Sequence, residues 1–161
     1  MIGAITWVRD YTLDGMNAGR TVHQLMREVK LPEDLTIGEF HGKASWAVKT
    51  IWDEYAGWFH YEDGTTQLYG VPRSAVNADL VELAGADALA ARARAHVEAG
   101  RPLEALHLTD ILLGTDPADK AALQVKKTAC EHLQVASGST NLSETMWLKS
   151  EIADVERRLA G

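Results

Sequence analysis

The side chains that most often perform chemistry in proteins are few and scattered in this chain. It has six histidines and one cysteine in 161 residues. None of the histidines forms an H-x-H or H-E-x-x-H pattern, the spacings with which neighbouring histidines bind zinc. Cys130 and His132 are two residues apart on a predicted helix, so they point to different faces. We therefore predict no metal site here, and we expect Cys130 to be a small buried filler rather than a reactive thiol.

The acidic residues and the serines also lack a catalytic arrangement. Neighbouring carboxylates such as Asp53 and Glu54 diverge on a helix, so they do not form an acid/base pair. Asp116 precedes Pro117 and is predicted to cap the following helix, and Asp63 is predicted to form a turn. The chain has no G-x-S-x-G, G-x-G-x-x-G or P-loop motif. The residues therefore predict no catalytic site in this chain.

One stretch is rich in aromatic residues. "FHGKASWAVKTIWDEYAGWF", residues 40–59, contains three of the five tryptophans. Its apolar residues recur at steps of four and three, which predicts a helix with a wide apolar face. The stripe consists of Ala44, Val48, Ile51, Tyr55 and Trp58.

These aromatic residues have two interpretations. In the first, Trp52 and Trp58 pack with Tyr55 in the core between helices. In the second, part of the cluster is buried against a second subunit, since aromatic residues are enriched at such interfaces. The predicted interface residues are Trp7, Tyr11, Trp52, Tyr55, Trp58 and Phe59.

The rest of the chain also has the periodicity of helices. Helices are predicted over residues 4–18 and between Ser74 and Gly85. Another is predicted to begin at a capping box at Thr21 and to end at Pro32. The last is predicted to begin at a Ser143 cap, to include the apolar Met146 and to continue to the end of the given sequence. Residues 33–42 are predicted to be a connector. Residues 60–73 are predicted to be a long loop, with a short hairpin at Asp63-Gly64.

The segment between these helices resembles tetratricopeptide (TPR) repeats. "AGRPLEAL" and "TDPADKAAL" fit the two turns of such helix-turn-helix units, of which about one and a half are visible. We expect neighbouring helices to approach closely along a stripe of small residues. That stripe consists of Ala88, Ala91, Ala95 and Ala99.

The predicted fold is all-α, a helical array with TPR-like repeats in one continuous domain. Its parts are N-terminal helices over 1–59, a loop over 60–73, TPR-like helices over 74–136 and a C-terminal helix over 137–161.

Composition excludes several classes of function. The net charge of −7 argues against nucleic acid as a partner. The sequence has no run of about 18 apolar residues, so no membrane span is predicted. The lone cysteine and the absence of a signal peptide predict a cytoplasmic protein, unless the chain is a fragment.

Several blocks of the chain occur together in one known family. "VRDYTLDGMNAGRTVHQLMREVKLPEDL", "HGKASWAVKTIWDEYAGWF" and "VELAGADALAARARAHVEAGRPLEALHLTDILLGTDPADKAA" follow one another in the order and spacing of that family. Between residue 8 and about residue 135 the chain resembles the dimerisation domain of the alkyl sulfatases, which belong to the metallo-β-lactamase superfamily.

The resemblance implies a function for the parent enzyme. It implies a homodimer, a preceding hydrolase domain with two zinc ions, and hydrolysis of sulfuric esters. The zinc-binding motif of that family does not occur in this chain, so we expect no cofactor here and no catalysis by this chain alone.

The resemblance also implies a substrate pocket near the start of the tryptophan-rich helix. Its candidate residues are His41, Lys43, Ser45 and Trp46. Trp46 occupies the position of a family histidine that faces the sulfate, and an indole offers one donor and no charge for sulfate recognition. The alternative to an assembly domain is a stand-alone TPR-like scaffold that binds another protein.

Overall fold

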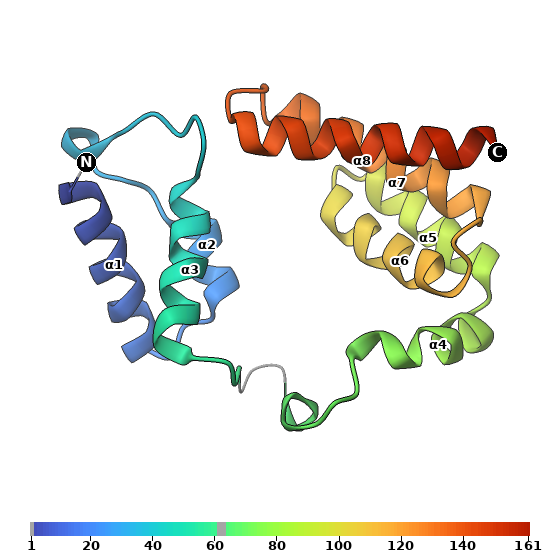
Figure 1. The fold of residues 1–161 in the computed structure, drawn as a ribbon, viewed down its shortest axis with the longest axis horizontal. Coiled ribbons are helices and arrows are strands. Elements are labelled where there is room, and N and C mark those ends of the chain that lie inside the picture. Colours follow the sequence, from blue (N-terminus) through green and yellow to red (C-terminus); the bar gives the residue numbers. More distant parts are fainter. Residues whose placement is uncertain (1, 61–63) are drawn as a thin grey trace. The chain divides into compact units, whose positions relative to one another are not determined.

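The computed structural model describes residues 2–60 and 64–161, and its regular elements there are all helices (Figure 1). This confirms the all-α prediction. The chain divides into two compact units, Met1–Val71 and Pro72–Gly161, which we call unit 1 and unit 2. The prediction of one continuous domain concerns how the two units associate, and it stays a prediction.

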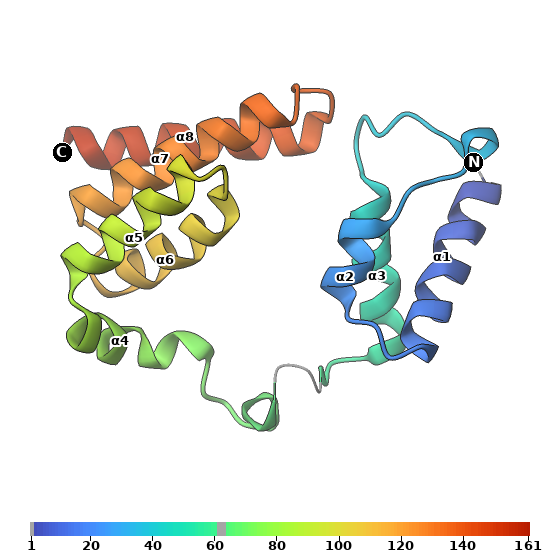
Figure 2. The same cartoon turned by 180° about the vertical axis from the view of Figure 1, so that it is seen from behind.

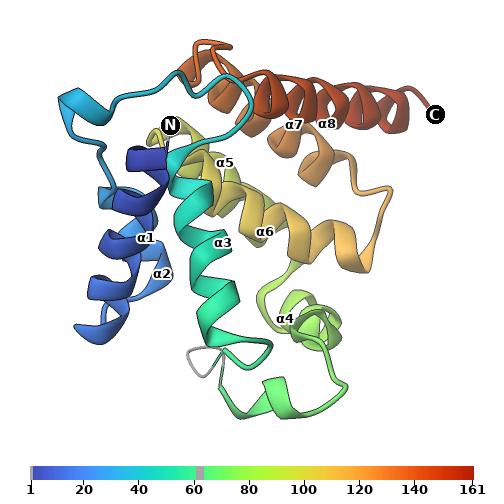
Figure 3. The same cartoon turned by 60° about the vertical axis from the view of Figure 1, so that its left-hand side comes forward.

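Unit 1 is built on three helices, α1 (Ile2–Asn17), α2 (Val22–Glu28) and α3 (Ala44–Ala56). Helix α3 contacts both α1 and α2, as the ribbon shows from two sides (Figures 1 and 3). A short 3-10 helix, η1 (Glu33–Leu35), interrupts the connector between α2 and α3. The core of unit 1 consists of Val8, Val22, Leu25, Val48 and Trp52.

The close contact of α1 with α2 depends on Gly15. A Cβ atom at this position would lie 2.4 Å from Cδ2 of Leu25, well inside contact distance. Leu25 itself is fully buried. Because only glycine leaves this space open, Gly15 allows the Leu25 side chain to lie against the α1 backbone.

The predicted capping box at the start of α2 is confirmed. The Thr21 hydroxyl accepts a hydrogen bond from the Gln24 N–H at 3.2 Å, and the Gln24 side chain accepts one from the Thr21 N–H at 2.8 Å. At the other end of unit 1, α3 ends at Gly57, whose φ of 69° lies in the left-handed region. This end was also predicted from the glycine.

The connection to unit 2 is described from residue 64 onward. There its regular elements before α4 are the short 3-10 helices η3 (Thr65–Leu68) and η4 (Arg73–Val76). The hairpin predicted at Asp63-Gly64 includes residue 63, which lies outside the described residues.

Unit 2 is an array of five helices within the described part of the chain (Figure 2). Helices α5, α6 and α7 each contact the next helix in the chain, α5 also contacts α7, and α4 contacts α5 and α6. Their order agrees with the predicted helix-turn-helix series, while the TPR-like detail stays a prediction. The helices are α4 (Asn77–Ala84), α5 (Ala86–Glu98), α6 (Pro102–Thr115), α7 (Lys120–Ala136) and α8 (Leu142–Ala160).

The prediction of the small-residue stripe on α5 is wrong. Ala88, Ala91, Ala95 and Ala99 are all exposed, whereas Ala90 and Ala93 are buried together with Val97. Alanine is a good helix former on any face, so alanine spacing alone does not select a buried face. The larger Val97 determines which face of α5 is buried, because its burial removes more apolar surface from water.

Two helix caps in unit 2 also differ from the prediction. The cap of α7 is Asp119, whose carboxylate accepts from the Ala122 N–H at 2.9 Å, while Asp116 accepts from the Ala118 N–H inside the preceding turn. Helix α8 begins two residues earlier than a Ser143 cap requires. Its cap is Asn141, which accepts from the Glu144 N–H at 2.9 Å.

The first turns of α8 consequently have a different buried face. Thr145 is buried and donates to the Asn141 carbonyl at 2.7 Å, whereas Met146, named as an apolar residue of this helix, is 58% exposed. A hydroxyl that is satisfied by its own helix can enter the core at low cost.

Candidate functional site

The aromatic residues at the start of the chain are fixed on the surface of unit 1. The rings of Trp7 and Tyr11 are stacked, with centroids 5.3 Å apart and an interplanar angle of 12°. The Tyr11 hydroxyl donates to the Leu25 carbonyl at 3.3 Å, and the Arg20 guanidinium lies 5.8 Å from the Tyr11 ring. Both aromatic rings are half-buried against the unit 1 core.

The tryptophans of the α3 region divide into one buried and two exposed residues. Trp52 is 4% exposed, so its predicted core position is confirmed. The core prediction is wrong for Tyr55 and Trp58, which are 56% and 74% exposed. Helix α3 ends at Ala56, and Gly57 redirects the chain, so Trp58 leaves the helical stripe. Figure 1 shows the chain turning away from α3 at this point.

Three aromatic residues follow closely on one another in the sequence at the carboxyl end of α3, of which Tyr55 and Trp58 are exposed and Phe59 is half-buried. The rings of Trp58 and Phe59 meet edge to face, with centroids 5.7 Å apart. We call Tyr55, Trp58 and Phe59 the α3-end aromatic cluster. Clustered exposed aromatic side chains are a feature of surfaces that bind another protein.

Unit 1 also has an open apolar cavity of about 330 Å³ between α1, α3 and the connector that precedes α3. His41 and Lys43, two of the predicted pocket residues, line it. Ser45 and Trp46 are not among the lining residues. The structure therefore brings together only half of the predicted pocket set at this cavity.

The charged residues at the cavity have defined local contacts. The Glu39 carboxylate accepts a hydrogen bond from the Ala44 N–H at 2.7 Å and so satisfies a donor of the first turn of α3. The Lys43 ammonium lies 5.7 Å from the centre of the Trp46 ring. His41 contacts Phe40 edge to face at 4.8 Å. Sequence reasoning missed Glu39, because it lies outside the positions at which helix caps are normally found.

The described residues contain no cluster of three or more His, Cys, Asp or Glu side chains that could hold a metal ion. They therefore do not fit the zinc site that the resemblance implies for the parent enzyme. Cys130 is 2% exposed, and burial raises the pKa of its thiol. A buried thiol that keeps its proton is a poor nucleophile, so the predicted filler role of Cys130 agrees with its position.

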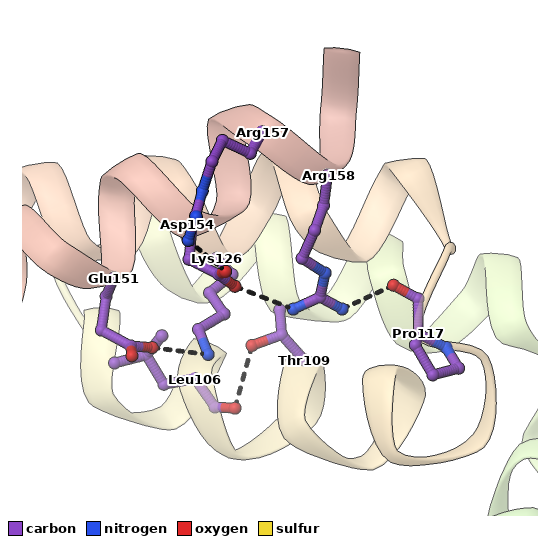
Figure 4. A network of polar contacts seen from close by, with 8 residues as sticks. All are labelled: Leu106, Thr109, Pro117, Lys126, Glu151, Asp154, Arg157 and Arg158. Carbon is purple, nitrogen blue, oxygen red and sulfur yellow. Dashed lines mark hydrogen bonds and ion pairs between the residues drawn. The ribbon is translucent and has the colours of Figure 1, made fainter. Parts of the chain in front are cut away.

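Unit 2 carries a polar network between α7 and α8 (Figure 4). The Lys126 ammonium and the Glu151 carboxylate are 2.8 Å apart, and both side chains are largely covered. Near the end of α8, Arg158 donates to the Pro117 carbonyl at 2.5 Å and pairs with Asp154 at 3.5 Å. Since this network joins α8 to α7 and to the turn before α7, we assign it a structural role. The sequence alone does not show that Lys126 faces Glu151, because the two residues lie on different helices.

None of the helices in the described part of the chain is long and apolar enough to cross a membrane.

Comparison with known proteins places these features in a family. Residues 21–151 match the family described as alkyl sulfatase dimerisation. The chain is 28% identical over 165 residues to a linear primary-alkylsulfatase of a Pseudomonas species, which covers 98% of this chain. It is 29% identical over 133 residues to an (R)-specific secondary-alkylsulfatase, also of Pseudomonas, and that match covers 79% of this chain.

Solved structures give the same result. The structure of the stereoselective inverting sec-alkylsulfatase Pisa1 from Pseudomonas covers 91% of this chain with a TM-score of 0.74 and 27% identity. A double mutant of the same enzyme covers 97% of this chain with a TM-score of 0.76 and 26% identity.

The chain spans only part of these relatives. It covers 30% of the primary-alkylsulfatase, 20% of the secondary-alkylsulfatase and 24% of each solved chain. The family match nevertheless extends over most of this chain, from the start of α2 into the middle of α8. This chain is therefore a member of the alkyl sulfatase dimerisation family.

Proposed function

We propose that this chain holds two subunits of an alkylsulfatase-like hydrolase together as a homodimer. The observation that carries the proposal is the α3-end aromatic cluster, where Trp58 is 74% exposed in a domain of a dimerisation family. Covering such side chains with a second copy would remove a large apolar area from water. Of the other predicted interface residues, Trp52 is buried in the core of unit 1, and Trp7 and Tyr11 lie half-buried on α1.

The chemistry of the parent enzyme is part of the same proposal. The relatives are named alkylsulfatases, which supports hydrolysis of sulfuric esters of alcohols. We assign that reaction to a preceding hydrolase domain with two zinc ions, because the described residues of this chain do not fit a metal site. The contribution of this chain would be assembly and one wall of the substrate pocket.

The pocket residues are proposed on the same basis. His41 and Lys43 line the cavity of unit 1, while Ser45 and Trp46 lie in the first turn of α3. Since Trp46 replaces the family histidine, we expect weaker recognition of sulfate than in relatives with histidine there. Replacing Trp46 with histidine in the parent enzyme should improve turnover of alkyl sulfates, and unchanged turnover would argue against this role.

A cytoplasmic location and the absence of a nucleic-acid partner are proposals as well. They are supported by the net charge of −7 and by Cys130, which is kept as a buried free thiol. The stand-alone TPR-like scaffold has less support, because the family match covers most of the chain and concerns dimerisation.

The test is the solution mass of this chain, measured by light scattering after size-exclusion chromatography over a dilution series. We expect a dimer that persists on dilution. Changing both Tyr55 and Trp58 to alanine should raise the dissociation constant of the dimer tenfold or more. Trp147→Ala is the matched control, since Trp147 is 67% exposed but lies on α8 in unit 2. A folded monomer at all concentrations would contradict the proposal.

A further inference from the structure

The connection between the two units contains a sequence that a serine protease can recognise. Residues 70–74 are Gly-Val-Pro-Arg-Ser, and Pro72 is the first residue of unit 2. We propose that the Arg73–Ser74 peptide bond is a site of limited proteolysis by a protease of trypsin-like specificity. Water adds across the bond, so that Arg73 ends in a new carboxylate and Ser74 begins with a new amino group. This inference goes beyond the proposed function, because it concerns how the two units are joined within one chain.

The side chains around this bond are accessible. Every residue from 68 to 76 is exposed, including the apolar Tyr69 and Val71 at 69% and 60%. Among the described residues, none between Trp52 and Ala90 is buried. Exposed connecting segments with few packed side chains are preferred sites of proteolytic cleavage.

The backbone before the bond has the conformation that a protease binds. Serine proteases hold the residues that precede the cleaved bond in an extended conformation. Tyr69, with φ −128° and ψ 157°, and Pro72, with φ −72° and ψ 156°, are both extended.

The bond itself lies in an element that opens easily. Arg73 and Ser74 begin the four-residue 3-10 helix η4, which has no buried residue and no side-chain cap. The hydrogen bonds of a 3-10 helix have poorer geometry than those of an α-helix, so a short one without buried side chains opens at low cost. A protease can therefore reach the bond without unfolding either unit.

Arg73 supplies the specificity. The pocket of a trypsin-like protease that receives the side chain before the cleaved bond has an acidic residue at its base, so it binds arginine or lysine. Arg73 is exposed, and the residues after the bond, Ser74 and Ala75, are small and uncharged.

Other bonds after basic residues are less suitable. Most lysines and arginines lie within α-helices, which must unfold before a protease can bind them. Lys30 lies outside a helix, but its neighbours Val29 and Leu31 pack against the core of unit 1. Arg101 precedes Pro102, and trypsin-like proteases cut poorly before proline.

Two further bonds are held by hydrogen bonds at helix starts. Arg20 precedes Thr21, whose N–H donates to the Gln24 side chain in the capping box. Lys43 precedes Ala44, whose N–H donates to the Glu39 carboxylate at 2.7 Å. We therefore expect the Arg73–Ser74 bond to be cut first.

The two products are expected to stay folded, because each unit has a core of its own. Leu25 and Trp52 belong to the core of unit 1, and Ala93 and Val125 belong to a core of unit 2. None of the core clusters in the described part of the chain combines residues from both units.

Limited digestion of the whole chain with trypsin, followed by mass spectrometry of the intact fragments, tests the proposal. We expect fragments 1–73 and 74–161 to appear first, roughly tenfold faster than cleavage at any other bond. The helical circular dichroism of the sample should be unchanged at that point. First cleavage at another bond, or fragments that are digested as fast as they form, would overturn the proposal.

Three variants locate the cleavage. Arg73→Gln should slow the first cut by roughly tenfold or more, while Arg73→Lys should still be cut. Lys30→Gln is the matched control and should leave the rate unchanged. All three replace an exposed side chain, so thermal unfolding should not change and a difference in rate does not come from folding. Equal cleavage of the wild type and Arg73→Gln would contradict the site.

Digestion over the dilution series separates this proposal from the assembly proposal. The rate is measured against a short arginine-containing peptide in the same sample and should not depend on protein concentration, since the bond lies outside the α3-end aromatic cluster. Protection that disappears on dilution would place the connection in a subunit interface and overturn the site. A monomer that is cut first at Arg73–Ser74 contradicts only the assembly proposal.

Discussion

The two units of this chain solve the problem of helix packing in different ways. In unit 1 the core is centred on large side chains, with Leu25 and Val48 fully buried and Trp52 nearly so. In unit 2 most of the buried core residues between α5, α6 and α7 are alanines, such as Ala93 and Ala105. Large side chains hold helices at a distance, while alanine lets backbones approach closely. We therefore expect unit 1 to be destabilised most by large-to-small substitutions and unit 2 by small-to-large ones.

The surfaces of the two units differ as well. Unit 1 exposes the α3-end aromatic cluster and an apolar cavity, whereas α7 and α8 of unit 2 are joined by ion pairs such as Lys126–Glu151. The ion pairs stabilise the α7–α8 pair internally, although α8 also exposes the apolar side chains of Met146 and Trp147.

The largest effect that would separate the two halves is expected for Trp52→Ala. Removing this buried indole from the small core of unit 1 should destabilise it by about 3–5 kcal/mol. Hydrogen exchange measured by mass spectrometry should show faster exchange in α1, α2 and α3, with α5, α6 and α7 unchanged. Trp58→Ala is the control, and its folding effect in the monomer should be small. Equal loss of protection in both units would show that they unfold as one.

The opposite substitution should affect unit 2. Ala93→Leu inserts three heavy atoms where α5 has no exposed surface and should cost about 1–3 kcal/mol. Ala91→Leu, two residues earlier on the exposed face, should change stability by less than about 0.5 kcal/mol. Urea unfolding followed by circular dichroism measures both variants. If the two variants are equally destabilised, the buried face of α5 has been assigned incorrectly.

Helix caps offer a finer comparison. Asn141 is 1% exposed, so Asn141→Ala removes a buried cap of α8 and should cost about 0.5–2 kcal/mol. Thr21→Ala removes the more accessible capping box of α2 and should fall toward the lower end of that range. Ser143→Ala, which removes no cap, is the control for thermal unfolding. A larger loss for Ser143→Ala than for Asn141→Ala would contradict the observed start of α8.

The smallest effect is expected for the Lys126–Glu151 pair. Burial lowers the pKa of Lys126, but the hydrogen bond to Glu151 and its negative charge outweigh burial, so the net shift is upward. Folding therefore favours the charged lysine. This stabilisation is complete below the unfolded lysine pKa of about 10.4 and is lost as the pH rises through the higher folded pKa.

Glu151→Gln should consequently lower stability by up to about 1 kcal/mol at pH 7. The difference from the wild type should shrink when unfolding is repeated above about pH 10.4. Glu156→Gln, which removes the more exposed partner of Lys127, should have a smaller effect. A difference for Glu151→Gln that is constant into strongly alkaline solution would show that the lysine charge is not involved.

Much of the fold follows from local signals in the sequence. The helical order, the Thr21–Gln24 capping box and the end of α3 at Gly57 were all predicted, since each depends on residues within one turn of one another. Trp52 was likewise placed correctly in the core from its helical spacing.

The failures arise where tertiary contacts decide. Asn141, Ser143 and other nearby polar residues can each cap a helix, and only the packing of α8 selects Asn141. Trp58 is exposed because the chain turns at Gly57. The spacing of the apolar residues continues past this turn and therefore does not predict it. The cavity was only partly indicated, because Ile5 on α1 and Ile51 on α3 are far apart in the sequence.

The buried position of Cys130 makes the protein convenient for site-specific labelling. It is the only cysteine of the chain and is 2% exposed on the buried face of α7. A cysteine introduced at an exposed site such as Ala91 should therefore react with maleimide dyes alone, without removal of the natural thiol. Mixing donor-labelled and acceptor-labelled protein would then report how fast subunits exchange between dimers.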